Sequence, residues 1–226
     1  MIMNMKTFIT SCLGLASFAS LALAAVPGFD ISHYQSSVDF GAAYSSGARF
    51  VIIKATEGTT YQDPKFSSHY AGATNAGLIR GGYHFARPAS SSGAAQATYF
   101  LAHGGGWSGD GITLPGMLDL EGDCAGLSTS AMVSWIRDFS DTYHGKTGRY
   151  PLLYTNPSWW SSCTGGSSAF VNTNPLVLAR YASSAGALPG GWPYYTIWQF
   201  NDAYKYGGDS DTFNGDLTQL KKLASG

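Results

Sequence analysis

Two carboxylates separated by one residue stand out in a chain that has few charges. Asp119 and Glu121 lie in the segment 117–123, which reads MLDLEGD. Successive side chains of a strand alternate between its faces, so both carboxylates point the same way, with Cα atoms roughly 6.5–7 Å apart. Such closeness raises the pKa of one carboxyl, which leaves a protonated acid beside an ionised partner, as glycoside hydrolysis requires. A metal site or a pair of helix caps is the alternative interpretation of this pair.

Other polar residues end neighbouring apolar runs. They are Asp30, Glu57, Tyr83 with His84, and Tyr154 with Thr155 and Asn156. In a parallel β/α barrel the active site forms where the strands end, so these side chains are expected to meet around the carboxylate pair. Asp30 and Glu57, taken alone, are equally compatible with capping the helices that follow them.

The elements that must position these residues alternate between strand and helix. Short apolar runs predict strands at 27–31, 50–55, 79–85, 117–120, 152–154, 176–181 and 196–200. Several are continuous, such as 50–53, which is typical of strands buried on both faces. Helices are expected at 40–46, 63–77, 92–103 and 128–144, the last capped by Ser128 or Ser130 and closed by Gly145. This order predicts an α/β fold, a modified TIM-like β/α barrel with fewer helices than strands, because the last third has little room for helices.

The amino-terminal segment is typical of a secretory signal peptide. Lys6 precedes the apolar stretch 8–23, and Ala22-Leu23-Ala24 resembles a cleavage site. A membrane anchor is the alternative, but the stretch is short and interrupted by Ser and Thr. We therefore expect a signal peptide at 1–24, a single catalytic barrel domain at 25–226, secretion, and no membrane contact after cleavage.

Two cysteines remain after the expected cleavage, Cys124 and Cys163. An even pair in an oxidising compartment predicts a disulfide. The two residues lack the spacing and the nearby His of a metal site, so we expect neither metal nor cofactor.

The charge balance narrows the range of partners. The formal net charge is −1, charged residues make up 12% of the chain, and no basic run appears. Nucleic-acid binding therefore has no electrostatic basis in the sequence.

Seven short motifs follow one another along almost the whole mature chain. They read GFDISHYQ (28–35), FVIIKATEG (50–58), GGYHF (81–85), LDLE (118–121), YTN (154–156), IWQF (197–200) and DSDTFNG (209–215). In this order they resemble the motifs of glycoside hydrolase family 25, the Ch-type lysozymes. Ser36 and Ser37 depart from the pattern, in which Gly, Pro or Glu is frequent, and this difference is expected to change a turn.

The resemblance implies a barrel with few helices and hydrolysis of the β-1,4 bond between N-acetylmuramic acid and N-acetylglucosamine in bacterial peptidoglycan. It implies that Glu121 is the general acid, that Asp119 is the carboxylate beside it, and that Asp30 and Asp209 are further acids of the site. Asp211 competes with Asp209 for that position. We expect a monomer that retains anomeric configuration through attack by the substrate's own acetamido oxygen.

Aromatic residues of the last third are expected to build a sugar groove, with about half of them packing in the core. They are Trp159, Trp160, Trp192, Tyr194, Tyr195 and Trp198. Among all candidates, we expect Glu57, Tyr83, Tyr154 and Trp198 to contact substrate.

Two other functions compete with a muramidase. A chitinase-like hydrolase would carry a longer D-x-x-D-x-D-x-E run, which is absent before Asp119. A sugar-binding lectin on an inactive barrel would have lost Glu121, which is present.

Overall fold

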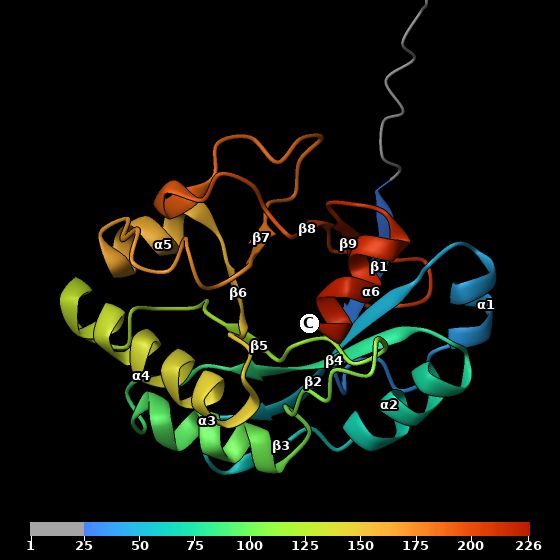
Figure 1. Cartoon of the computed structure of the whole chain (residues 1–226), viewed down its shortest axis with the longest axis horizontal. Coiled ribbons are helices and arrows are strands. Elements are labelled where there is room, and N and C mark those ends of the chain that lie inside the picture. Colours follow the sequence, from blue (N-terminus) through green and yellow to red (C-terminus); the bar gives the residue numbers. More distant parts are fainter. Residues whose placement is uncertain (1–24) are drawn as a thin grey trace, which may run out of the picture.

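The structure is a computed structural model that describes residues 25–226. The expected signal peptide at 1–24 lies outside the described residues. The rest of the chain folds around one sheet, with helices on its outer side (Figure 1).

The sheet closes on itself into a barrel. Its strands are β1 (Val26–Ile31), β2 (Phe50–Glu57), β3 (Tyr61–Gln62), β4 (Ile79–Phe85), β5 (Met117–Asp119), β6 (Leu152–Thr155), β7 (Leu176–Ala179), β8 (Ile197–Asn201) and β9 (Asp209–Phe213). The order is β1-β9-β8-β7-β6-β5-β4-β2-β3, and an additional pairing of β1 with β2 closes the circle. Eight strands therefore form the barrel, and β3 only folds back on β2 as a short hairpin.

All the expected strands are present, with small shifts at their ends, and β3 and β9 are additional. β9 is antiparallel to both β1 and β8. The segment between β8 and β9 is too short for a crossover helix, so the chain must turn back. The first residue of β9, Asp209, is therefore brought to the barrel end at which the parallel strands finish, opposite Asp30.

Six α-helices accompany the barrel in the described residues, so the expectation of fewer helices than strands is confirmed. They are α1 (Phe40–Ser45), α2 (Phe66–Asn75), α3 (Gly93–Ala102), α4 (Thr129–Thr147), α5 (Pro157–Thr164) and α6 (Leu217–Ser225). The short helices α5 and α6 were not expected.

The end expected for α4 is wrong. The helix passes through Gly145 and ends at Thr147, where Gly148 adopts the left-handed conformation with φ 74°. Gly148 is favoured there because that backbone conformation is costly for residues with a side chain. Ser128 is the N-cap, and its side chain accepts a hydrogen bond from the Ala131 amide.

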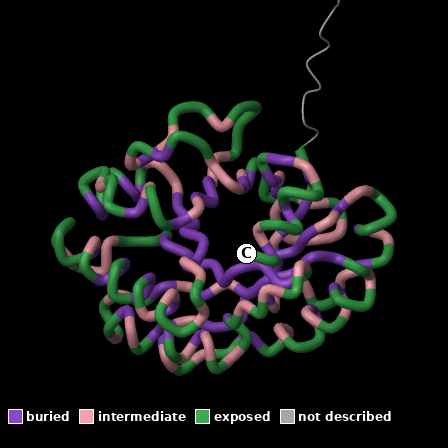
Figure 2. Tube along the Cα trace, in the orientation of Figure 1, coloured by how far each residue is buried: buried purple, intermediate pink, exposed green. Residues whose placement is uncertain are grey.

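Side-chain alternation along the strands divides the core into layers. Inward-facing residues such as Phe50, Ile52 and Leu152 fill the barrel, and Leu220 and Ala224 of α6 close its amino-terminal end. Outward-facing residues meet α3, α4 and α5 in a second layer. Figure 2 shows the strands as the most continuously buried part of the chain. The amino end is thus sealed, and the carboxyl ends of the strands are left to form a site.

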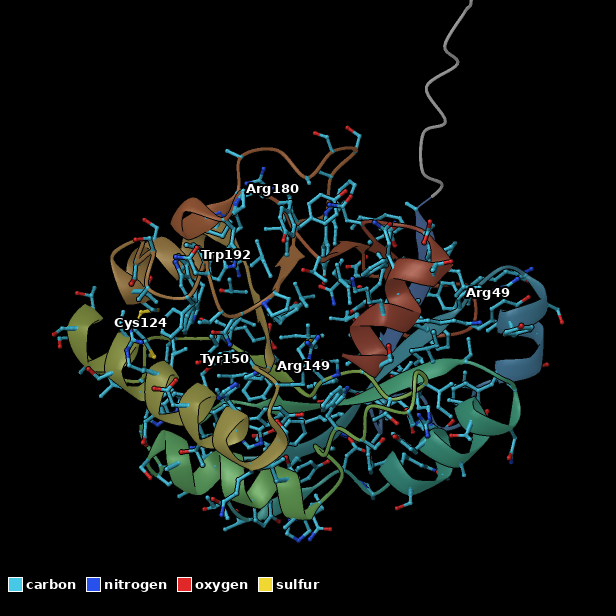
Figure 3. The ribbon with its side chains drawn as sticks, in the orientation of Figure 1. Arg49, Cys124, Arg149, Tyr150, Arg180 and Trp192 are labelled. Carbon is cyan, nitrogen blue, oxygen red and sulfur yellow. A yellow bond between two sulfur atoms is a disulfide. The ribbon has the colours of Figure 1, made fainter. Side chains whose placement is uncertain are left out.

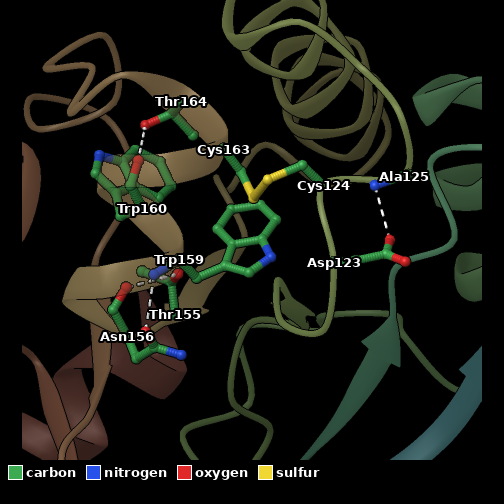
Figure 4. Close-up of a disulfide and its surroundings, with 9 residues drawn as sticks. All are labelled: Asp123, Cys124, Ala125, Thr155, Asn156, Trp159, Trp160, Cys163 and Thr164. Atoms are coloured by element: carbon green, nitrogen blue, oxygen red, sulfur yellow. Dashed lines mark hydrogen bonds between the residues drawn. A yellow bond between two sulfur atoms is a disulfide. The ribbon is translucent and has the colours of Figure 1, made fainter.

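The expected disulfide is confirmed. Cys124, in the loop after β5, is bonded to Cys163 of α5, with Cα atoms 5.2 Å apart (Figure 4). The bond therefore ties the loop that follows Glu121 to the helix that follows β6.

Removal of this bond is expected to lower the free energy of unfolding. The bridge closes a loop with a sequence separation of 39 residues. The chain-entropy model assigns roughly 3–4 kcal/mol to a loop of this size. Chemical denaturation of the Cys124→Ser/Cys163→Ser double variant should show this loss. A variant as stable as the parent would contradict it.

Candidate active site

Polar side chains gather at the carboxyl end of the barrel. The inward-facing positions change from apolar to polar as each strand approaches this end, because the residues there no longer pack against α6. The polar set consists of Asp30, Lys54, Tyr83, Asp119, Tyr154, Gln199, Asp209 and Asp211. Glu121 stands at the rim, two residues after Asp119.

Asp119 lies in the interior of the barrel, whereas Glu121 lies at the surface. Asp119 ends β5 and is only 5% exposed, and its Oδ1 has no hydrogen-bond partner among the described residues. Burial raises the pKa of Asp119 well above its usual range, and repulsion from Glu121 and Asp30 adds to this effect. Glu121 lies just beyond the strand and is exposed. Partial desolvation raises its pKa as well, while the Lys54 ammonium opposes the rise and Asp209 supports it.

A protonated carboxyl is therefore available beside the unpartnered Asp119. Since both carboxyl groups titrate together, the proton belongs to the pair rather than to one residue of the free enzyme. A substrate oxygen at the rim would meet Glu121 first, because Glu121 is the exposed member of the pair.

Lys54 is a site residue for which no role was predicted from the sequence. It is 8% exposed, and its Nζ donates to Glu57 Oε2 at 2.7 Å. Arg87 Nε donates to the other oxygen of Glu57 at 2.8 Å. Burial opposes ionisation of Glu57, but these bonds outweigh it and lower its pKa. Glu57, which was expected to contact substrate, is thus bound by two cationic side chains. Lys54 could have been identified from the sequence, because it is a charged residue that follows the apolar residues of its strand.

Gln199 joins the acids on the opposite side of the barrel. Its Nε2 donates to Asp30 Oδ2 at 2.7 Å and to Asp209 Oδ2 at 3.1 Å. Its Oε1 accepts from the Tyr154 hydroxyl at 2.8 Å and from Tyr181 at 3.2 Å. Because the amide must accept from two hydroxyl groups, its nitrogen is directed at the two carboxylates. Gln199 therefore holds Asp30, Tyr154 and Asp209 in one network. From the sequence it was recognised only as part of a motif and had no assigned role.

Both Asp209 and Asp211 face the site. They are two residues apart on β9 and thus share a face. Asp211 is 2% exposed, and its Oδ1 has no hydrogen-bond partner among the described residues. Burial raises the pKa of Asp211 well above its usual range, and repulsion from Asp30 and Asp209 adds to the rise. Asp209 lies nearer the surface.

Gly208 permits this close approach of β9 to β1. Its φ is 79°, and a side chain there would collide with the carbonyl oxygen of Asp30. Glycine is thus required at this turn both by its backbone conformation and by lack of space.

The two tyrosines remain hydrogen-bond donors. Burial raises the pKa values of Tyr83 and Tyr154 well above 10, and repulsion from Asp119 adds to the rise. The Tyr83 hydroxyl makes no side-chain bond that competes with a ligand among the described residues. Both side chains point into the barrel beside Asp119.

Trp198 is not part of this group. It follows Ile197, which points inward, and so lies on the outer face of the barrel, where its Nε1 donates to the Arg180 carbonyl at 2.9 Å. Trp192, Tyr194 and Tyr195 line a different pocket, of about 430 Å³, at the amino ends of β7 and β8. Arg149, which Figure 3 labels together with Trp192, lines the same pocket. The expected aromatic groove is therefore not formed by these four residues.

The acid network makes stability depend on pH. Burial, with repulsion from Asp209, raises the pKa of Asp30 from 3.8 to about 7. The folded protein thus holds a proton that the unfolded chain has lost between about pH 4 and 7, so this contribution to stability is present at acid pH and is lost as pH rises through about 7. The free energy of unfolding of the parent should rise between pH 7.5 and pH 5, and Asp30→Asn is expected to reduce that rise by on the order of 1–4 kcal/mol.

Calorimetry across this range tests the prediction, with the exposed Asp141→Asn on α4 as the control. An Asp30→Asn variant with the parent's full pH dependence would contradict it.

Among residues 25–226, no group of three or more His, Cys, Asp or Glu side chains is arranged to hold a metal ion. Within the same part of the chain, no helix combines the length and apolar character needed to cross a membrane.

Comparison with known proteins places this geometry in a family. The model of glycosyl hydrolases family 25 matches residues 29–209. A protein of Chalaropsis sp. named N,O-diacetylmuramidase is 69% identical over 89% of this chain and all of its own length. One of the same name from Arthroderma benhamiae is 63% identical over 89% of this chain and 87% of its own.

A solved structure agrees with these matches. The structure of a family GH25 lysozyme from Aspergillus fumigatus has a TM-score of 0.89 and 59% identity, and the match covers 90% of this chain and 100% of that one. The family resemblance, the enzyme class and the barrel expected from the sequence are confirmed by these matches and by the fold. The chain belongs to glycosyl hydrolases family 25, and it is a glycoside hydrolase.

Proposed function

We propose that this enzyme is a muramidase, which hydrolyses the β-1,4 bond between N-acetylmuramic acid and N-acetylglucosamine in bacterial peptidoglycan. The observation that supports this most directly is the carboxyl pair at the barrel mouth, with Asp119 buried and unpartnered and Glu121 exposed at the rim. The names of the relatives at 69% and 63% identity, both N,O-diacetylmuramidase, point to the same substrate.

The side chains have distinct roles in this proposal. Glu121 protonates the leaving oxygen, because it is the exposed member of the carboxyl pair that shares a proton. Asp119 orients the acetamido group of the muramic acid and offsets positive charge that develops on it. Tyr83 donates a hydrogen bond to the sugar from the floor of the site. Asp30 and Asp209, fixed by Gln199, bound the site on the opposite side.

Acceptance of O-acetylated muramic acid is a finer part of the proposal. It is supported by the name of the two relatives, which refers to a substrate that carries both N- and O-acetyl groups. We expect the enzyme to lyse O-acetylated walls and chemically de-O-acetylated walls from the same bacteria at rates within about tenfold of each other. A strong preference for de-O-acetylated walls would contradict this expectation.

We also propose that residues 1–24 are a signal peptide, that the enzyme is secreted, and that residues 25–226 act as a monomeric catalytic domain. The disulfide between Cys124 and Cys163 supports an oxidising destination. Amino-terminal sequencing of the protein from the culture medium would test the cleavage after Ala24.

Turbidity of purified bacterial walls, measured beside release of sugar from chitin, tests the function itself. Clearing of walls with little action on chitin is the expected result. Faster cleavage of chitin would favour the chitinase-like alternative, and binding to walls without cleavage would favour a lectin.

A further inference from the structure

The imidazole of His84 does not join the acids at the barrel mouth, contrary to the expectation from the sequence. Tyr83 points into the barrel, so the next residue of β4 points outward. There the His84 ring packs beside Phe100 and Phe139, with ring centroids 5.5 and 5.4 Å away. The side chain is fully buried, and burial lowers the pKa of His84 to about 4, so the ring is neutral. A buried polar ring among phenylalanines needs hydrogen-bond partners.

Both ring nitrogens of His84 have a partner, and the partners define its tautomer. The Arg87 amide donates to Gln96 Oε1 at 3.0 Å, so this atom is the carbonyl oxygen and must also accept from His84 Nε2, at 2.9 Å. The proton of the neutral ring is therefore on Nε2, and Nδ1 accepts from the Thr56 hydroxyl at 2.7 Å. The ring thus links Thr56 of β2 to Gln96 of α3.

The side chain of Gln96 binds both main-chain polar groups of Arg87. Its Oε1 accepts from the Arg87 amide, and its Nε2 donates to the Arg87 carbonyl at 2.7 Å. The Nε2 group also donates to Ser91 Oγ at 2.9 Å. Gln96 is fully buried, so water does not compete for these bonds. One side chain therefore fixes the backbone of Arg87, in the segment after β4.

Arg87 extends this fixed geometry to the mouth of the barrel. Its Nε donates to Glu57 Oε1 at 2.8 Å, and its Nη2 lies 2.6 Å from the same oxygen. Glu57 Oε2 accepts from Lys54, so Lys54, Glu57 and Arg87 form an ion array with two positive charges and one negative charge. The Arg87 side chain is 55% exposed, and an ion pair this exposed is weak when its side chains must be ordered for it. A backbone fixed by Gln96 lowers that entropic cost.

We infer that His84 and Gln96 are positioning residues for the reaction: they place Arg87 so that the ion array keeps a net positive charge beside the carboxyl pair of Asp119 and Glu121. The inference rests on the proposed function, in which Glu121 gives its proton to the leaving oxygen. It assigns to a buried polar group outside the barrel an effect on the acid inside the mouth.

The carboxyl pair is surrounded by groups of both charges. They are Asp30 of β1, Lys54 and Glu57 of β2, Arg87 after β4, Asp209 of β9, and the neutral Tyr83 and Tyr154. Burial raises the pKa of Glu121, and Arg87 is one of the two cations that oppose this rise. If Arg87 is no longer held in place, Glu57 keeps its negative charge while the array loses a positive charge, so the pKa of the pair rises further. Since the general acid must be protonated, the alkaline limb of the pH–rate profile then moves to higher pH.

Rates of wall lysis measured across the pH range test this inference. Gln96→Met, which removes the bonds to Arg87, is expected to move the midpoint of the alkaline limb up by roughly 0.3–1 pH unit. On that limb, this shift is about a two- to tenfold higher rate relative to the maximum. Arg87→Met should move the midpoint at least as far, and Arg87→Lys, which restores the charge, should move it less. In the Arg87→Met background, Gln96→Met should add no further shift, because Gln96 acts through Arg87.

A matched control separates positioning from loss of stability. Asn174 is buried as well, and its Nδ2 donates to Ser140 Oγ at 2.8 Å and to the Pro151 carbonyl at 2.9 Å. It precedes β7 and so lies at the amino end of the barrel, opposite the mouth. Asn174→Leu should lower Tm, as Gln96→Met does, but leave the alkaline midpoint in place. If Gln96→Met is too unstable to assay, Thr56→Val, which removes only the hydroxyl donor to His84, takes its place with a smaller shift in the same direction.

The outcomes distinguish this inference from the proposed function. If the parent lyses walls and the midpoint of the Gln96 or Thr56 variant does not move, or moves equally in Asn174→Leu, the inference is wrong and the function stands. If the parent does not lyse walls, the function itself is wrong.

Discussion

Replacement of Glu121 by Gln is expected to lower the rate of wall lysis roughly 10²–10⁴-fold without loss of the fold. Gln keeps the size of the side chain but has no proton to give to the leaving oxygen. Because Glu121 is exposed just after β5 and its side chain makes no hydrogen bond to any other residue of 25–226, Tm should stay close to the parent value. Initial rates of turbidity loss and a thermal melt measure the two effects.

The matched control is Asp141→Asn, which removes an exposed carboxyl on α4 far along the chain from the site. It should lyse walls like the parent. Lysis by Glu121→Gln within tenfold of the parent would exclude Glu121 as the general acid and transfer that role to Asp119, whose pKa is raised further.

The sequence predicted the parallel part of the barrel well because its strands are buried on both faces. Runs such as 50–53 are continuously apolar, and the polar residues that follow such runs mark the end of the barrel at which the site lies. β9 was missed since DSDTF has only one apolar residue, Phe213, and so lacks the apolar run by which the other strands were recognised. α5 was missed although Asn156 and Pro157 are a capping residue and a favoured first helical residue, because this segment was interpreted only as the end of a strand.

The individual roles in the site were harder to predict than its location. The alternation of side chains along β8, which can be derived from sequence, places Gln199 inward and Trp198 outward. Trp198 was nevertheless expected to contact substrate, because aromatic side chains stack on sugar rings. The contact of Glu57 with Arg87 could not be predicted, since it joins the end of β2 to the segment after β4. Long-range contacts of this kind depend on how loops pack, which local sequence patterns do not specify.

Asp119→Asn is expected to lower the rate roughly 10²–10³-fold. The side chain lies inside the barrel, where low solvent exposure strengthens its interaction with positive charge on the sugar. Asn retains the shape and an oxygen that can orient an acetamido group, but it cannot offset that charge. The affinity for a non-hydrolysed glycan should change much less than the rate, because the positive charge exists only during the reaction. An equal loss of affinity and rate would contradict this role.

The stereochemistry of the parent enzyme decides how Asp119 acts. A protein nucleophile and a general acid must approach the scissile bond from opposite sides, whereas Asp119 and Glu121 both come from the end of β5. Attack by the acetamido oxygen of the muramic acid resolves this conflict, with Glu121 acting first as acid and then as base, and it predicts retention. In the competing inverting route, Asp30 or Asp209 would activate water from the opposite side, since β9 lies across the barrel from β5. NMR of the first-formed reducing end distinguishes the two: an initial β-anomer is expected, and an initial α-anomer would exclude the substrate-assisted route.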